Sequence, residues 1–315
     1  MGKTVPMRDG YGKALLELCE KRDDVMVLDA DVAKSTRTVW IRDQYPDKFM
    51  DMGIAEQDMV GTAAGLALSG MVPFVSTYCV FLAGRAWDQI RTTVCYNNLN
   101  VKFGGAHAGI SVGPDGATHQ ALEDVALMRV LPNMTVIVPC DAEETRKATL
   151  AMARMEGPCF VRFGREAVPV VTDENTPFEV GRARLVREGT DVVVFANGAL
   201  VYESQQAAGQ LAAEGISVQV YDLHTIKPLD EETVVAAARA AGCVVTAEEH
   251  QENGGMGGAV AECLAKHCPV PMEMVAVHDS FGESGQPAEL MEKYGLSCAA
   301  IVEKIKTVLL RKQGS

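Results

Sequence analysis

One carboxylate in this chain is well placed to transfer protons. Glu56 belongs to the segment GIAEQD (residues 53–58), which precedes GTAAGLALSG (residues 61–70), a run of small and apolar residues that predicts a buried helix. A carboxyl group in such surroundings loses solvation, so its neutral form becomes accessible and it can both give and take a proton. The alternative is an ordinary acid in a first helical turn, which the helix dipole favours.

Two aromatic residues form a second candidate feature. Tyr78 and Phe81 lie in a loop just past a predicted strand (residues 72–76). A solvent-facing aromatic pair at such a position indicates that a flat group packs on it. Ordinary packing in the core is the alternative.

A glycine-rich loop carries the other titratable candidates. The segment AHAGISVGPDGATHQ (residues 106–120) presents His107, Asp115 and His119 between a predicted strand and a predicted helix. Polar titratable groups on such loops are typical of active sites. Spacings of eight and four residues in an irregular loop do not match a zinc site, so we expect no metal to be held here.

Alternating helices and strands position these loops. Apolar residues at helical intervals follow residue 9 and Glu56, and a capping box formed by Asp141 and Glu144 predicts the start of another helix. The predicted strands are short apolar runs between the helices. They span residues 25–32, 72–76, 100–105, 134–139 and 159–164 in the first half, and residues 191–196, 217–223, 243–249 and 273–277 in the second.

The alternation predicts an α/β fold with two doubly wound domains, each with helices on both faces of a parallel sheet. Ligands of such sheets bind beyond the carboxyl ends of the strands, where the candidate loops lie. Residues 165–189 interrupt the pattern with a stretch that carries Pro and Glu. We therefore expect a first domain over residues 1–175, a linker over 176–190 and a smaller domain over 191–315.

Composition excludes several classes of protein. The net charge of −13, without a cluster of Lys and Arg, argues against nucleic acid as a partner. Nine cysteines without a C-x-x-C pair argue against a disulfide framework and a zinc site. No segment approaches the ~18–20 apolar residues that span a bilayer, and the N-terminus lacks an apolar signal core. We expect a cytoplasmic protein that does not bind membranes.

Several motifs in order resemble one family. The segments GIAEQDM, GPDGATHQALEDVALMRVLPNMTVIVPCD and VRFGRE, together with the aromatic loop, resemble the pyrimidine-binding domain of transketolase. Residues 191–304 are similar to the C-terminal domain of that family, so the resemblance covers nearly the whole chain. It implies the thiamine-diphosphate-binding fold for residues 1–175.

The resemblance assigns roles on the cofactor side of the site. Glu56 would be catalytic, because it would hydrogen-bond N1′ of the thiamine diphosphate aminopyrimidine; help of this kind is worth ~10²–10⁴-fold. Phe81 would stack on the pyrimidine, Tyr78 would line its pocket, and Asp31 matches an acid close to the cofactor. Gly84 stands where many transketolases have a third aromatic residue, so the pocket is expected to be more open there.

Other matched residues would bind the substrate. His119 and Asp115 would contact hydroxyls near the reacting carbons of the donor ketose, and His119 would also assist proton movement as a catalytic residue. A guanidinium suits phosphate oxygens because its donors form a rigid fork. The positions that match those gripping the sugar phosphate are Arg8, Ser35, His107 and Arg165.

Half of the full-length enzyme has no counterpart here. The family's diphosphate- and metal-binding domain is missing, which implies the C-terminal subunit of a split transketolase. Such a subunit transfers a two-carbon ketol unit from a ketose phosphate to an aldose phosphate only with a separate N-terminal subunit, which would hold the diphosphate and Mg²⁺ or Ca²⁺. A heterotetramer with two copies of each subunit is expected.

Three questions stay open at this point. The chain could be half of another thiamine diphosphate enzyme, such as a 1-deoxyxylulose-5-phosphate synthase-like protein or a 2-oxo acid dehydrogenase β subunit, although a 2-oxo acid has no phosphate to hold. It could also be a scaffold subunit without catalytic activity, although the intact site residues argue against this. The sugars are open too, as is the pathway, which could be the pentose phosphate route or a specialised catabolic one.

Overall fold

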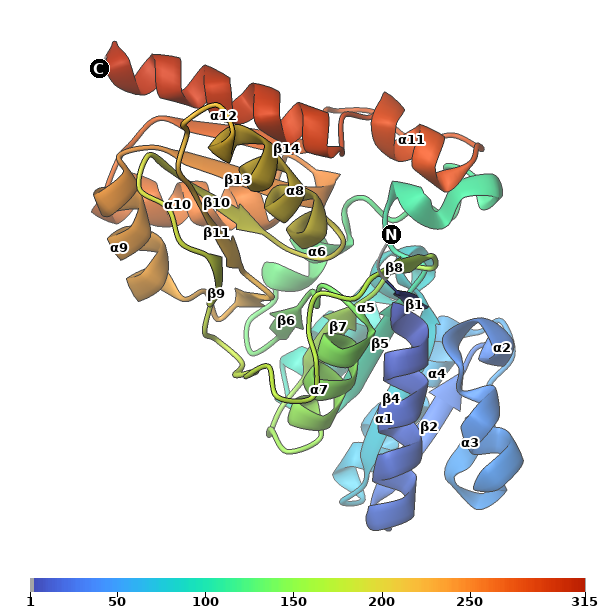
Figure 1. The fold of residues 1–315 in the computed structure, drawn as a ribbon. Coiled ribbons are helices and arrows are strands. Elements are labelled where there is room, and N and C mark those ends of the chain that lie inside the picture. The colour runs from blue at the N-terminus through green and yellow to red at the C-terminus, as the bar shows by residue number, and fades with distance from the viewer. Residues whose placement is uncertain (1–2, 315) are drawn as a thin grey trace.

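A seven-stranded sheet, parallel except for one edge strand, forms the centre of the first domain (Figure 1). The structure is a computed structural model, and it describes residues 3–314. In sheet order the strands are β12 (Thr225–Lys227), β6 (Thr135–Ile137), β7 (Cys159–Arg162), β5 (Lys102–Ala106), β4 (Val72–Tyr78), β2 (Val25–Asp29) and β3 (Phe49–Asp51).

Helices cover both faces of this sheet because the strand side chains alternate between two hydrophobic layers. On β2, Val25 and Val27 pack with α1 and α7, whereas Leu28 packs with α4 on the opposite face. The helices of this domain are α1 (Met7–Lys21), α2 (Ala33–Thr36), α3 (Val39–Gln44), α4 (Glu56–Leu68), α5 (Trp87–Gln89), α6 (Asp124–Arg129) and α7 (Ala142–Met152). Shorter turns are the 3₁₀ turns η1 (Pro46–Lys48) and η4 (Ile110–Asp115) and the π-helical turns η2 (Phe81–Arg85) and η3 (Ile90–Cys95).

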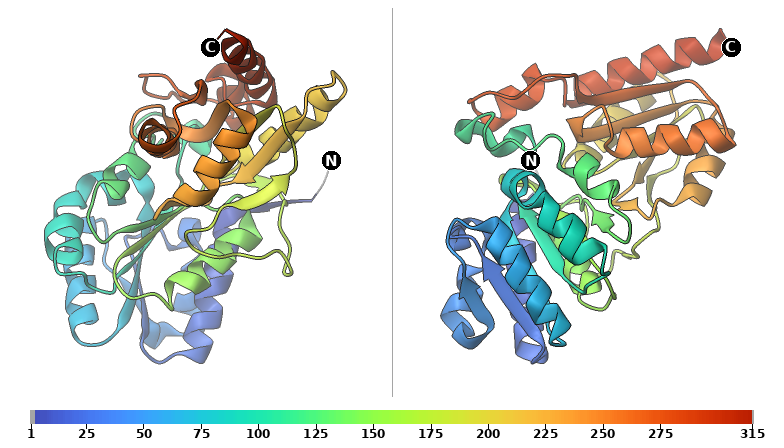
Figure 2. Two further views of the ribbon diagram at one scale, coloured as in Figure 1. Left: turned by 90° about the vertical axis from the view of Figure 1, so that its left-hand side faces the viewer. Right: turned by 180° about the vertical axis from the view of Figure 1, so that it is seen from behind.

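The second domain repeats this architecture on a smaller sheet. Helices α8 and α12 pack on one face of that sheet, and α9 and α10 on the other (Figure 2). In sheet order the strands are β14 (Met272–Val277), β13 (Val244–Gln251), β10 (Val192–Ala196), β11 (Val218–Asp222) and the antiparallel β9 (Arg184–Arg187). The helices are α8 (Leu200–Ala212), α9 (Glu231–Ala241), α10 (Met256–His267), α11 (Pro287–Lys293) and α12 (Cys298–Gln313).

The two domains share a hydrophobic core. One continuous cluster runs from Val75 and Phe103 in the first sheet to Phe195 and Val260 in the second domain. Strand β12, although it follows β11 in sequence, pairs with β6 at the edge of the first sheet. A separate antiparallel pair, β1 (Thr4–Pro6) and β8 (Ala167–Pro169), ties the start of the chain to the segment that leaves the first domain.

The predicted fold class is confirmed, and the elements differ from the prediction in several places. The helix expected near residue 119 begins only at Asp124. Gly113, within η4, and Gly116, directly after it, adopt positive φ and turn the chain before the helix. The long helix α12 was not predicted from the sequence. Strand β9 lies in the stretch expected as a linker, and β12 crosses from the expected second domain into the first sheet. No helix within residues 3–314 has the length and apolar character required to cross a membrane.

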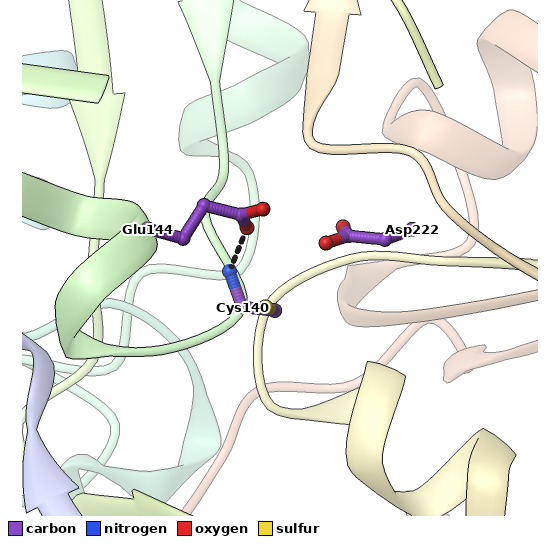
Figure 3. A group of neighbouring side chains, drawn as sticks. All are labelled: Cys140, Glu144 and Asp222. Carbon is purple, nitrogen blue, oxygen red and sulfur yellow. Dashed lines mark hydrogen bonds between the residues drawn. The ribbon is translucent and has the colours of Figure 1, made fainter. Parts of the chain in front are cut away.

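A buried polar cluster joins the domains beside the start of α7 (Figure 3). Asp141 caps α7 as predicted, since its Oδ1 accepts the N–H of Glu144 at 2.9 Å. The Glu144 carboxylate accepts the N–H of Cys140 at 2.7 Å and faces Asp222, which ends β11 in the second domain. One ligand atom from each of Cys140, Glu144 and Asp222 lies within 4.8 Å of the others.

A guanidinium already occupies the place that a cation would take in this cluster. Arg184 Nη2 donates to Asp222 Oδ2 at 2.7 Å, and Nε lies 3.8 Å from Glu144 Oε1. One guanidinium balances only one of the two carboxylates. Burial and, secondarily, the charge of Asp222 raise the pKa of the Glu144 carboxyl well above its usual range. We conclude that this cluster is a domain junction in which burial disfavours the charged form of Glu144.

The Glu144→Gln variant should therefore be less sensitive to pH than the wild type. A raised pKa in the folded state gives stability that is present below about pH 4, the unfolded value, and is lost as the pH rises through the folded pKa. The wild type should lose more free energy of unfolding than the variant between pH 5 and pH 8, as measured by urea denaturation. Glu20→Gln, an exposed change on α1, should follow the wild type. Parallel pH curves for wild type and Glu144→Gln would show that Glu144 is ionised when folded.

Candidate active site

The candidate residues meet at the switch point of the first sheet. From β2 the chain moves to β3 on one side, and from β4 it moves to β5 on the other. This reversal opens a crevice at the carboxyl ends of β2 and β4, the usual ligand position in such sheets. Loops after β2, β3, β4 and β5 converge there and carry most of the predicted residues, whereas Arg8 lies at the start of α1 and Arg165 follows β7.

Glu56 begins α4 at this crevice and is only 2% exposed. Its Oε2 lies 2.7 Å from Nη1 of Arg85, and its Oε1 has a contact of 3.5 Å from the hydroxyl of Thr77. The carboxylate is thus buried as predicted, but its surroundings are not purely apolar. Arg85 was not predicted as a site residue from the sequence. The π-helical turn η2 brings its side chain back toward α4.

The two predicted aromatic residues lie side by side in the crevice. Tyr78 ends β4 and Phe81 begins η2, with their ring centroids 6.1 Å apart. The guanidinium of Arg85 lies 4.6 Å from the centroid of the Phe81 ring, a cation–π contact. A Cβ added at Gly84 would have no heavy atom within 4 Å, so the space beside this turn is open.

His107 and His119 pack edge-on against these rings. The His107 ring lies 4.3 Å from Tyr78, and the His119 ring lies 5.2 Å from Phe81. His107 is 3% exposed, and its Nδ1 is buried without a hydrogen-bond partner. Burial, followed by the charges of Arg8 and Arg165, lowers the pKa of His107 to about 3. The imidazole is therefore neutral in this state and keeps a free polar atom for a ligand.

Two arginines from different segments complete a positively charged cluster. Arg8 Nη1 donates to the carbonyl of Ser35 at 3.4 Å, while its Nε is buried without a partner. The hydroxyl of Tyr78 donates to Ser35 Oγ at 3.0 Å. Arg165 donates to the carbonyl of Val112 at 3.0 Å. Burial and then the charge of Arg37 lower the pKa of Arg8, and the charge of Asp9 opposes them.

Asp115 is the only predicted anion near these cations. Its Oδ1 lies 3.3 Å from Arg165 Nη1, and both side chains are about one-third exposed, at 35% and 31%. Glu166 contributes a longer contact of 3.7 Å to the same guanidinium. The unpartnered Nε of Arg8 and Nδ1 of His107, together with the charge of Arg165, fit an oxyanion, which would be held by charge-assisted hydrogen bonds.

A second buried acid, which was not predicted from the sequence, holds the loop after β2 by hydrogen bonds. Asp29 accepts hydrogen bonds from the N–H of Val32 and from the hydroxyls of Thr36 and Thr38, at 2.7, 2.8 and 2.8 Å. Burial raises its pKa to about 6. This loop carries Ser35 and Arg37, so Asp29 is a positioning residue for the cluster. The signal was present in the sequence, because an acid ends the apolar run of β2.

Asp31 is less closely connected to the site than the other predicted residues. It is exposed, with φ of 60°, and its N–H donates to Asp51 at 3.2 Å. The side chain of Glu56 bonds to Thr77 and Arg85 rather than to this residue. The proximity of Asp31 to a cofactor stays a prediction.

The ion pair between Glu56 and Arg85 should give a measurable interaction free energy in a double-mutant cycle of protein stability. Arg85→Ala leaves a buried carboxylate without its counter-charge, whereas the same change in a Glu56→Gln background leaves a neutral amide. Because Arg85 is 43% exposed, we expect a coupling of about 1 kcal/mol from urea denaturation of the double-mutant cycle. The exposed Arg91→Ala should show no coupling to Glu56. Equal costs of Arg85→Ala in both backgrounds would contradict the pair.

Comparison with family models identifies the two halves of the chain. Residues 3–171 match the transketolase pyrimidine-binding domain, and residues 181–301 match the transketolase C-terminal domain. The site residues described above all fall in the first match. The order of the two matches is the order inferred from the sequence.

Several named proteins are similar over nearly the whole chain. A 6-deoxy-6-sulfo-D-fructose transketolase subunit of a Clostridium species is 42% identical, covering 97% of this chain and 95% of its own. An apulose-4-phosphate transketolase subunit of Phocaeicola vulgatus is 36% identical, covering 96% and 98%. Mouse transketolase is 36% identical, but the chain spans only 50% of it.

Solved structures agree with these matches. A split-gene transketolase, solved as an inactive β4 tetramer, has a TM-score of 0.92 and 47% identity, covering 98% of this chain and 99% of that one. Campylobacter jejuni transketolase shares the fold, with a TM-score of 0.81 at 23% identity; it covers 97% of this chain and 47% of that one. The chain belongs to the transketolase family and is a C-terminal subunit of the split type.

Proposed function

We propose that this chain forms the pyrimidine-binding half of a thiamine diphosphate site shared with a separate subunit. The observation that carries the proposal is the buried carboxylate of Glu56 beside the rings of Phe81 and Tyr78. Glu56 Oε1 has only the long contact to Thr77, so it is free to bond a ring nitrogen. The open space at Gly84 supports room for a flat group near Phe81.

Glu56 holds a proton at N1′ of the aminopyrimidine in this proposal. When bound, the cofactor supplies the carbanion chemistry. A buried carboxyl fixed at the start of a helix can shift a proton along one hydrogen bond without moving, which is the requirement for general acid–base help. Arg85 limits the cost of the charged form, because its guanidinium lies 2.7 Å away.

His119 and Asp115 orient the sugar near the reacting carbons, and the positively charged cluster holds the far end. The unpartnered Nε of Arg8 and Nδ1 of His107 support an oxyanion there. A 2-oxo acid carries no such distal anion, so the cluster favours a sugar phosphate or a sugar with another terminal oxyanion. Two of the relatives are named for a sulfonated sugar and for a sugar phosphate, which fits this chemistry.

The reaction is the transfer of a two-carbon ketol unit from a ketose to an aldose. An N-terminal subunit holds the diphosphate and Mg²⁺ or Ca²⁺, and two copies of each subunit form the active heterotetramer. Two relatives that match over nearly their whole length are named as transketolase subunits, which supports a separate partner polypeptide.

A reconstitution assay tests the proposal as a whole. The purified chain and its N-terminal partner should each be inactive alone, and should together convert xylulose 5-phosphate and ribose 5-phosphate or close analogues only when thiamine diphosphate and Mg²⁺ are present. Turnover by this chain alone, or without the cofactor, would contradict the shared site.

Glu56→Gln should stop deprotonation of the cofactor while leaving the subunits assembled. In the reconstituted enzyme, hydrogen–deuterium exchange at C2 of thiamine diphosphate should slow by ~10²-fold or more, because the amide cannot transfer a proton to N1′. Asp58→Asn changes an exposed acid in the same helical turn and should exchange at the wild-type rate. Wild-type exchange in Glu56→Gln would remove Glu56 from the mechanism.

Arg165→Ala should weaken binding of substrates that carry a terminal oxyanion. Loss of one charge-assisted contact predicts a KM for a phosphorylated ketose that is about 10- to 100-fold higher, with KM for an unphosphorylated donor such as erythrulose changed by less than about twofold. The exposed Arg239→Ala, on α9, serves as the control. An equal rise for both donors would rule out anion recognition by Arg165.

A further inference from the structure

A cavity of about 470 Å³ lies between the two domains, behind the candidate active site. Its walls include Met7, Gly164 and Glu166, which are direct chain neighbours of Arg8 and Arg165. Ser111, in η4, also lines it. The predicted substrate and cofactor residues are absent from its described lining, so this cavity is distinct from the crevice at Glu56.

The cavity opens at the switch point of the second sheet. From β10 the chain moves to β11 on one side, and from β13 it moves to β14 on the other. The carboxyl ends of β10 and β13 therefore flank a crevice, the position where α/β sheets bind ligands. Asn197, directly after β10, and Glu249, near the end of β13, both line the cavity.

The side chain of Asn197 leaves a buried donor unpaired. The residue is 2% exposed, and its Nδ2 is buried without a hydrogen bond. A buried amide left unpaired costs about 1–3 kcal/mol in folding, so the group is costly unless a ligand completes it. Gly198, the next residue, also lines the cavity and adopts φ of 55°.

Negative charge dominates the polar wall. Glu203, Glu249 and Glu292 line the cavity together with Glu166. The cation Arg162 is already engaged, because it donates to Asp124 at 2.7 Å and to the carbonyl of Glu249 at 2.7 Å. Burial, and to a smaller extent the charge of Glu292, raises the pKa of Glu203, whose Oε2 accepts the N–H of Cys298 at 3.2 Å.

Apolar side chains complete the cavity. Phe163, Val168, Met291 and Leu296 contribute to its lining, so a ligand must have an apolar body. The N-terminus of α8 begins at the wall without a side-chain cap, and it favours an anion with about half a unit charge. The carboxylates of Glu203 and Glu292, which lie on the same wall, outweigh this partial charge.

We propose that this cavity binds a small organic cation, in which an ammonium or similar group faces Glu203 and Glu292, an acceptor atom pairs with Asn197, and an apolar body packs against Phe163 and Met291. The site is separate from the one that binds thiamine diphosphate and sugar. Glu249 connects the two, since its Oε1 accepts the N–H of Ser111 at 2.6 Å, in the same turn that carries Asp115. An effector in the cavity would therefore contact the backbone that positions the substrate residues.

Three probes with one apolar body and one ether acceptor, but different charge, test the proposal. The amine 2-phenoxyethylamine, the alcohol 2-phenoxyethanol and the carboxylate 3-phenoxypropionate are titrated into the full chain by calorimetry and ligand-observed NMR, without cofactor, sugar or partner subunit. The amine should bind saturably at one site, with a Kd at least about tenfold below those of the alcohol and the carboxylate. Absence of saturable amine binding, or tighter binding of the carboxylate, would overturn the proposal and leave the proposed function untouched.

Variants locate the binding site. Glu292→Gln and Glu203→Gln should each weaken amine binding about fivefold or more and leave the weak binding of the alcohol unchanged. Glu289→Gln changes an exposed acid on the same helix as Glu292 but outside the cavity, and should bind the amine normally. Asn197→Leu should weaken amine binding without lowering the melting temperature, because it removes an unpaired polar group. Amine binding that all three cavity variants leave unchanged would contradict the assignment.

Discussion

Parallel strands end at the same edge of their sheet, and this constraint brings the site together. Ser35, Glu56, Tyr78 and His107 are dispersed over some seventy residues, yet each lies at or beyond the end of a parallel strand at the same crevice, and α1 brings Arg8 to it. The reversal of strand order between β2 and β4 keeps that crevice free of a crossover helix. Within it, α4 starts with a buried carboxylate, and the π-helical turn η2 returns Arg85 to balance it. In the proposed function, proton transfer by Glu56 depends on this pairing of burial with a nearby counter-charge.

The crevice and the cavity behind it carry opposite charge: the crevice is positively charged and the cavity is negatively charged. The crevice holds two arginines, Arg8 and Arg165, and unpartnered nitrogens on Arg8 and the neutral His107, whereas the cavity behind it holds carboxylates and an unpaired amide. Turn η4 lies between them and is fixed from the second domain: Gln120 donates to the carbonyl of Glu283 at 2.9 Å, and Glu249 accepts from Ser111. The second domain thus supports the substrate loop as well as packing against the first sheet.

Much of the fold could be predicted from the sequence because helical and strand periodicities alternate clearly, and the core strands fall where apolar runs predict them. Strands β9 and β12 were missed since each is short and sits at a sheet edge, where partners distant in sequence decide pairing. Loop chemistry predicted Glu56, Tyr78, Phe81 and His107, but Arg85 required a π-helical turn that local propensity does not encode. Arg37 and Asp29 act through hydrogen bonds and long-range charge, which spacing alone does not show.

A proton shared between Glu56 and the cofactor ring would be visible by NMR. Thiamine diphosphate labelled with ¹⁵N at N1′ is bound to the complex of this chain and its N-terminal partner, and the coupling of that nitrogen to a proton is recorded. We expect an N1′ signal that is coupled to a bound proton in the wild type and uncoupled in Glu56→Gln. An N1′ nitrogen without a proton in the wild-type complex, or one that the substitution leaves unchanged, would show that Glu56 does not share a proton with the ring.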